Sequence, residues 1–207
     1  MESKLRRADI VIIASAHNPS IIAPQWLKDN SLIIESPIHF VHTPDFSLFD
    51  SESFSLVVDH QRLQITAKKQ DKESLRSLAN IASNYVKLLP HIPYRSLGLN
   101  FIWSIHFDEG EKVAKIRLNI NESNLSSLFE GHEVNYGGII YAKKESYTLK
   151  LVIEPQGRNT LVHNFNYHHE AEGISVEDLA RLIDNFLPRY EDSSRIVRGL
   201  CLIGEKK

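Results

Sequence analysis

Three of the chain's ten histidines stand close together, at His163, His168 and His169. Imidazole nitrogens bind metal ions and exchange protons near neutral pH, so this cluster is the first candidate for chemistry. Because side chains alternate along a strand, His163, Tyr167 and His169 would share one face and His168 would point to the other. An aromatic residue then lies between the two histidines, which does not suit a shared metal ion. We take His163, Tyr167 and His169 as candidate ligand-binding residues, and we expect ordinary core or surface histidines rather than a metal site.

The rest of the sequence carries no catalytic motif. It has no Gly-x-Ser-x-Gly elbow for a nucleophilic serine, no His-Glu-x-x-His and no Cys-x-x-Cys. Cys201, the single cysteine, lies in an apolar run rather than at a helix start, which is typical of a buried, unreactive thiol. Gly137-Gly138 does not precede a predicted helix, so it is not expected to bind phosphate. We therefore expect no enzymatic activity, no cofactor and no metal.

A local basic patch consists of Lys68, Lys69, Lys72 and Arg76, at the start of a predicted helix. The second long predicted helix and its flanks are acidic instead, with Glu170, Glu172, Glu177, Asp178 and Asp184. Opposite charges on two related helices would steer head-to-tail association or attract a charged partner. The alternative is that both are ordinary solvated helix faces.

Composition limits the possible functions. The chain has 207 residues, 24 Lys and Arg against 26 Asp and Glu, and a formal net charge of -2. Duplex nucleic acid demands a basic excess that this chain lacks, so dedicated duplex binding is disfavoured. The apolar runs are strand-sized and far shorter than the roughly 20 residues of a membrane helix, so we expect no membrane association. The basic N-terminus lacks a clear cleavage site, and a single cysteine fits a reducing compartment, so we expect a cytoplasmic protein.

The elements that must position these residues follow from periodicity. Helical spacing predicts a helix over residues 71–89, with an apolar stripe of Leu75, Leu78, Ala82 and Tyr85. A second helix is predicted over 176–187, ended by Pro188, with a closing strand over 196–203. The segments predicted as short helices are 24–30 and 124–130, and those predicted as strands or extended chain are 9–16, 32–43, 54–58, 62–67, 97–107, 112–120, 134–143, 147–154 and 160–169. Residues 44–53 are predicted as a loop.

The order of these elements suggests a duplication. Residues 8–107 and 112–204 each read β-α-β-β-β-α-β, with Asp108–Glu111 as the turn between them. We predict an α+β fold in which two pseudo-repeated modules form a mainly antiparallel sheet, with two long helices packed on one side. A single continuous domain, two unrelated domains and a coincidental order are the alternatives.

At the level of architecture, this order resembles the TATA-binding-protein-like fold. None of the DNA-contacting residues of that family can be matched here, and the strand after each long helix departs from that fold. A fainter likeness rests on Gly98-Leu99-Asn100-Phe101-Ile102, which is similar to a Gly-Leu-Arg-Tyr-Ile-Asn stretch in a large uncharacterised bacterial family. Asn100 stands where that family has Arg, and the likeness implies no function.

The function expected from these observations is a non-catalytic, cytoplasmic binding or assembly protein acting through protein–protein contacts. Its partner would be another protein or a second copy of the chain. Two alternatives belong to other classes. One is a nucleic-acid-associated accessory factor that uses a saddle-like sheet face. The other is an enzyme or small-ligand carrier with a site between the two halves, where His163, Tyr167 and His169 would be the candidates.

Overall fold

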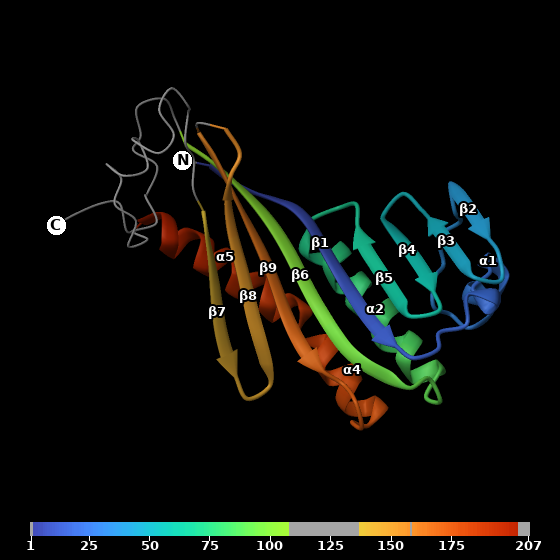
Figure 1. Ribbon diagram of the computed structural model, residues 1–207. Coiled ribbons are helices and arrows are strands. Elements are labelled where there is room, and N and C mark those ends of the chain that lie inside the picture. Colours follow the sequence, from blue (N-terminus) through green and yellow to red (C-terminus); the bar gives the residue numbers. More distant parts are fainter. Residues whose placement is uncertain (1, 108–136, 158, 203–207) are drawn as a thin grey trace.

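The computed structural model describes residues 2–107, 137–157 and 159–202, and their fold is α+β (Figure 1). Its centre is one open antiparallel sheet of nine strands in the order β2-β3-β4-β5-β1-β6-β9-β8-β7. The strands are β1 (Glu2–Ala14), β2 (His39–His42), β3 (Phe46–Asp50), β4 (Phe54–Asp59), β5 (Arg62–Ala67), β6 (Tyr94–His106), β7 (Gly138–Lys144), β8 (Tyr147–Pro155) and β9 (Thr160–Glu170). The helices are a 3-10 turn η1 (Pro19–Ile21), α1 (Pro24–Asp29), α2 (Lys72–Leu88), α4 (Val176–Asp184) and α5 (Phe186–Leu202).

Three long strands form the middle of the sheet. β1 and β6 pair from Glu2↔His106 to Ala14↔Tyr94, with a bulge between Leu5 and Arg7. β6 then pairs with β9 along almost its whole length. β1 begins seven residues earlier than the predicted strand at Asp9, because the end of β6 supplies it with a partner.

Helices α2, α4 and α5 cover one face of the sheet, and they lie behind the strands in Figure 1. The strands alternate accordingly, so that one side chain in two is buried along β5 and β8. Phe101 of β6 stacks on Phe186 of α5 with ring centroids 4.9 Å apart, which fixes the start of α5 on the sheet. Among the described residues, no helix is long and apolar enough to cross a membrane.

The first long helix is confirmed. Asp71 precedes α2 and its side chain accepts a hydrogen bond from the Ser74 backbone N–H, as an N-cap does. The predicted stripe is buried, and the helix stops just before Pro90. The capping residue, the apolar period and the proline all agree, so local sequence determines this element.

The prediction for the end of the chain is wrong. The second helix ends at Asp184, and a further helix, α5, runs from Phe186 to Leu202 where a strand over 196–203 was expected. Pro188 lies in the first turn of α5, where its missing N–H would have had no helical partner, so it begins a helix instead of ending one. Trp103 Nε1 donates to Ser193 Oγ at 3.0 Å, and this buried contact holds α5 against β6.

Smaller differences occur near β2. Residues 44–53, predicted as a loop, contain β3, whose buried positions are Ser47 and Phe49. Ser47 Oγ donates to the Ile22 carbonyl at 2.7 Å, so a polar residue occupies a core position. The alternation of apolar and polar residues that would predict a strand is therefore missing from the sequence. Of the extended segment 32–43, only His39–His42 pairs as a strand. The three strands predicted between 134 and 169 are confirmed as β7, β8 and β9, with shifted ends.

Strands from both predicted modules join a single sheet, with β6 beside β9. The described residues do not show a repeated element order, because the second half ends in a helix instead of a strand. The strand predicted over 112–120, the short helix over 124–130 and the turn at Asp108–Glu111 lie outside the described residues. The fold that the structure supports is a nine-stranded antiparallel sheet with three helices packed against one face.

Candidate functional site

The three candidate residues on β9 all face the helices. His163 is 2%, Tyr167 0% and His169 1% exposed, and His168 lies on the other face of the strand. His169 lies six positions after His163, which corresponds to about 20 Å along a strand, too far for one metal ion. Among the described residues, no group of three metal-binding side chains comes together.

The surroundings of His169 and Tyr167 are aromatic and cationic. The Arg189 guanidinium lies 4.0 Å from the centre of the Tyr147 ring and 5.5 Å from that of Tyr167. Tyr167 Oη donates to Asp192 Oδ2 at 3.2 Å, and burial raises the pKa of this hydroxyl above its ordinary range. These contacts join β8, β9 and the start of α5, which makes them packing contacts of the core.

Burial favours the neutral form of both buried histidines of β9. It lowers the pKa of His163 to about 4 and also lowers the pKa of His169. Among the described residues, neither ring nitrogen of His169 has a hydrogen-bond partner, and the same holds for Nδ1 of His163. A general base needs both contact with its substrate and a pKa near the working pH. Two imidazoles enclosed in this way do not meet the first requirement, contact with a substrate.

The predicted basic patch is matched by anions from other elements. Lys68 Nζ lies 2.7 Å from Asp50 Oδ1, Lys69 Nζ 3.3 Å from Glu52 Oε1, and Lys72 Nζ 2.8 Å from Glu191 Oε1. The fourth residue, Arg76, is exposed one turn further along α2. Three of the four cations therefore take part in contacts within the molecule, and they stabilise the turn between β3 and β4 and the approach of α5 to α2.

A ladder of polar side chains crosses the uncovered face of the sheet. Asp9 is only 4% exposed, and Arg7 Nε lies 2.7 Å from its Oδ2. Asn100 Nδ2 donates to Asp9 Oδ1 at 2.9 Å, and Asn166 Nδ2 donates to Asn100 Oδ1 at 2.6 Å. These residues meet because Asp9, Asn100 and Asn166 are partners in register on β1, β6 and β9. Each of these three residues is recognisable in the sequence as a polar position of its strand, but only the register between the strands brings the three side chains together.

Exposed apolar side chains gather at the two edges of the sheet. β2 and β7 lie at opposite ends of the strand order, as Figure 1 shows. The exposed large hydrophobic residues on β2 or in the segment that leads into it are Ile34, Ile38, Phe40 and Val41, and those on β7 are Ile139, Ile140 and Tyr141. In the described residues only Leu88 and Ile174 join them from elsewhere. Sequence reasoning missed this feature, because both segments look like ordinary half-buried strands until the strand order is known.

A hollow lies on the surface near the start of β6. It has a volume of about 230 Å³, and its lining includes Ser15, Arg95, Glu172 and Ile174. Arg95 Nε already donates to Ser15 Oγ at 2.7 Å. None of these polar side chains is buried, so the hollow does not have the enclosed, convergent donors of a small-molecule site. The chain matches no protein-family model and no curated protein.

Proposed function

We propose that this protein is a non-catalytic binding or assembly protein of the cytoplasm, and that its partner is another copy of the chain joined through the edges of the sheet. One observation carries the proposal. Of the nine large hydrophobic side chains exposed in the described residues, six lie on the edge strands β2 and β7 or directly before β2, and a seventh, Ile34, lies five residues before β2. Scattered exposed hydrophobic residues are normal, whereas a grouping of this kind is typical of an interaction surface.

The chemistry of a sheet edge supports the same proposal. An edge strand presents backbone N–H and C=O groups on its outer side, and another strand can pair with them. Natural proteins usually protect such edges with charged residues, with prolines or by keeping the strand short. Exposed Ile139, Ile140 and Tyr141 on β7 do the opposite, because apolar side chains favour burial against a partner.

Lysine substitutions at the two edges test this proposal. We expect sedimentation velocity to show reversible self-association of the wild-type protein between about 1 and 300 µM. Ile140→Lys on β7 or Val41→Lys on β2 should weaken it, because a charge is costly to bury in a strand–strand contact. Leu88→Lys is the matched control, because Leu88 is 38% exposed but lies on α2. A wild-type protein that stays monomeric over the whole range would contradict the proposal.

Nucleic-acid binding through the uncovered sheet face is the less supported alternative. Two cations of that face are already paired, with Arg7 Nε 2.7 Å from Asp9 Oδ2 and Arg62 Nε 3.5 Å from Asp59 Oδ2. Phosphate binding would require cations available for release of counterions. Affinity for single-stranded oligonucleotides that falls steeply with salt would favour this alternative over assembly.

A further inference from the structure

We infer that two copies of this chain join their sheets by pairing β7 with β7 in antiparallel orientation, about a two-fold axis at Ile140. The inference rests on the proposed function. It adds the edge that is used, the register of the two strands and the charge pair that aligns them.

The two edges are not equally suited to pairing. β2 has four residues, and Pro37 and Pro44 stand close to its two ends, which is how natural proteins blunt an edge. β7 has seven residues and no proline. Among the described residues, no strand pairs with the outer side of β7. The longer edge, which lacks proline and carries charge only at its last two residues, is the better template for a second strand.

Antiparallel pairing centred on Ile140 covers the most exposed apolar residues of the edge. It places Ile139 of each copy opposite Tyr141 of the other, so the contact forms twice. These two residues are 56% and 66% exposed in the single chain. Both lie on the uncovered face, beside Val152 and Lys150 of β8. A β-branched residue opposite an aromatic residue is a favourable cross-strand pair.

The same register creates a charge pair. It places Lys143 of one copy opposite Gly137 of the other. A Cβ atom at Gly137 would lie 2.0 Å from the Ile153 carbonyl oxygen and 3.3 Å from Glu154 Cα, so only glycine fits and no side chain separates Lys143 from Glu154. With strands about 4.8 Å apart, the Cα atoms of Lys143 and Glu154 would be about 10 Å apart, which their extended side chains can span.

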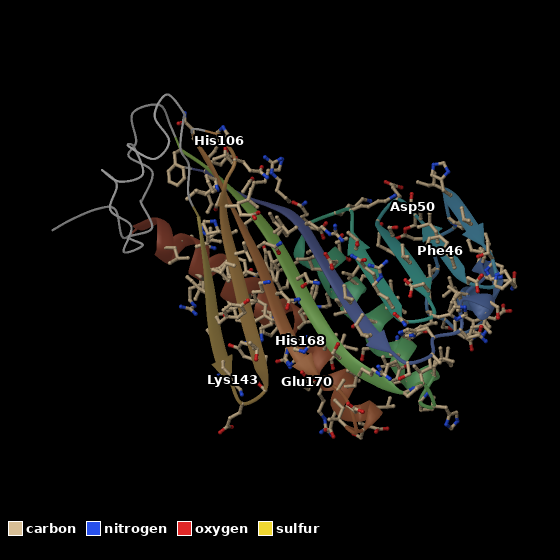
Figure 2. The ribbon with its side chains drawn as sticks, viewed as in Figure 1. Phe46, Asp50, His106, Lys143, His168 and Glu170 are labelled. Carbon is tan, nitrogen blue, oxygen red and sulfur yellow. The ribbon has the colours of Figure 1, made fainter. Side chains whose placement is uncertain are left out.

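Charge also selects the strand direction. Figure 2 shows Lys143 at the end of β7 that leads into the turn to β8, and Lys143 and Lys144 are both exposed there. Parallel pairing in register would set these lysines opposite themselves, which is unfavourable. Antiparallel pairing separates them and brings Lys143 to an opposite charge. An interface formed by one pair of seven-residue strands is small for a specific protein–protein contact, so we expect a dissociation constant in the micromolar range.

Cysteine cross-linking tests the edge and the register together. In a Cys201→Ser background, Ile140→Cys should form a disulfide dimer under mild oxidation. The two residues would face each other with Cα atoms about 4.5–5.5 Å apart, within disulfide range. Val41→Cys is the control on the other edge, since Val41 is 47% and Ile140 42% exposed. A dimer cross-linked by Val41→Cys and not by Ile140→Cys would overturn the β7 inference and leave the proposed function standing. If neither cysteine variant forms a cross-linked dimer and the wild-type protein does not self-associate, both the β7 inference and the proposed function would be overturned.

A charge exchange tests the ion pair. Lys143→Glu and Glu154→Lys should each weaken self-association about tenfold, because each dimer holds two such pairs and each substitution sets like charges together. The double variant should recover most of the wild-type affinity. Lys87→Glu, at an exposed position on α2, should leave it unchanged. Failure of the double variant to recover affinity would overturn the register, even for a protein that dimerises.

Discussion

In the part of the chain that the structure describes, three histidines, His17, His163 and His169, are buried, and burial lowers the pKa of each. His17 has a structural role that nothing in the sequence pattern singles out. Its Nε2 lies 3.2 Å from the Ile12 carbonyl, so this nitrogen carries the proton, and its Nδ1 accepts from the Tyr85 hydroxyl at 3.0 Å. A neutral imidazole thus connects the end of β1 to helix α2.

The buried histidines make stability depend on pH. In the unfolded chain a histidine titrates near pH 6.5, whereas the pKa of His163 in the folded protein is about 4. Below pH 6.5 the unfolded state binds a proton at His163 that the folded state does not bind, so the free energy of unfolding falls as the pH drops from about 6.5 to about 4. For His163 alone we expect a loss of about 2 kcal/mol between pH 7 and 5.

Urea unfolding of His163→Leu at these two pH values measures that loss. The variant should lose less stability on acidification than the wild-type protein. Substitution of the exposed His91 by Leu is the control and should leave the pH dependence unchanged. An equal acid response in His163→Leu and wild type would show that His163 is not protected from protonation by the fold.

The polar ladder on the uncovered face should contribute to stability as well. Asp9→Ala removes an acceptor that serves Arg7 and Asn100, and it leaves the Asn100 donor without this partner at a half-buried position, whereas Arg7 is partly exposed to solvent. We expect a loss of about 1–3 kcal/mol in the free energy of unfolding. Asn164→Ala, at an exposed position on the same face, should change it by less than about 0.5 kcal/mol. Equal changes in the free energy of unfolding for the two substitutions would contradict a stabilising role of the polar ladder.

Residue positions were only partly predictable from the sequence. Strand alternation correctly placed His163, Tyr167 and His169 on one face, because this period is local. It did not reveal that helices cover that face, nor that Asp9, Asn100 and Asn166 meet across three strands. Those facts depend on register between segments far apart in the sequence, which local patterns do not encode.

Among the elements, α5 shows most clearly that tertiary packing can outweigh local secondary-structure propensity. Ile196 and Val197 favour a strand by propensity, yet Val197 is 1% exposed within a helix that packs on the sheet. α2 was predicted correctly because its cap, period and stop agree. β3 was missed because the buried position at Ser47 is polar. The errors fall where packing outweighs local preference.

Gly199 gives a test of α5. It lies at an exposed position within the helix, and an added Cβ would meet no atom within 4 Å. We expect Gly199→Ala to stabilise the protein by about 0.5–1 kcal/mol, because alanine loses less conformational entropy in a helix than glycine. Thermal unfolding measures the change, with Gly199→Pro as the opposite control. A destabilising Gly199→Ala would contradict the helix over Phe186–Leu202.

For the whole molecule, the strand order carries the functional argument. The sequence predicts an α+β protein with antiparallel strands and helices on one side, and the structure confirms this. It does not predict that β6 and β9 join both halves into one sheet, nor that β2 and β7 become the edges. Because β7 is an edge strand, its three exposed apolar residues form a candidate assembly surface.

Hydrogen exchange at two protein concentrations, about tenfold below and tenfold above the midpoint of association, tests assembly through the sheet edges most directly. Among the described residues, no strand bonds the outward backbone N–H groups of β7, and a second strand would bond them in the proposed assembly. We expect exchange in β7 to slow at the higher concentration, while exchange in the central strands β1 and β6 stays the same. Exchange in both edge strands that does not depend on concentration would contradict assembly through the edges of this sheet.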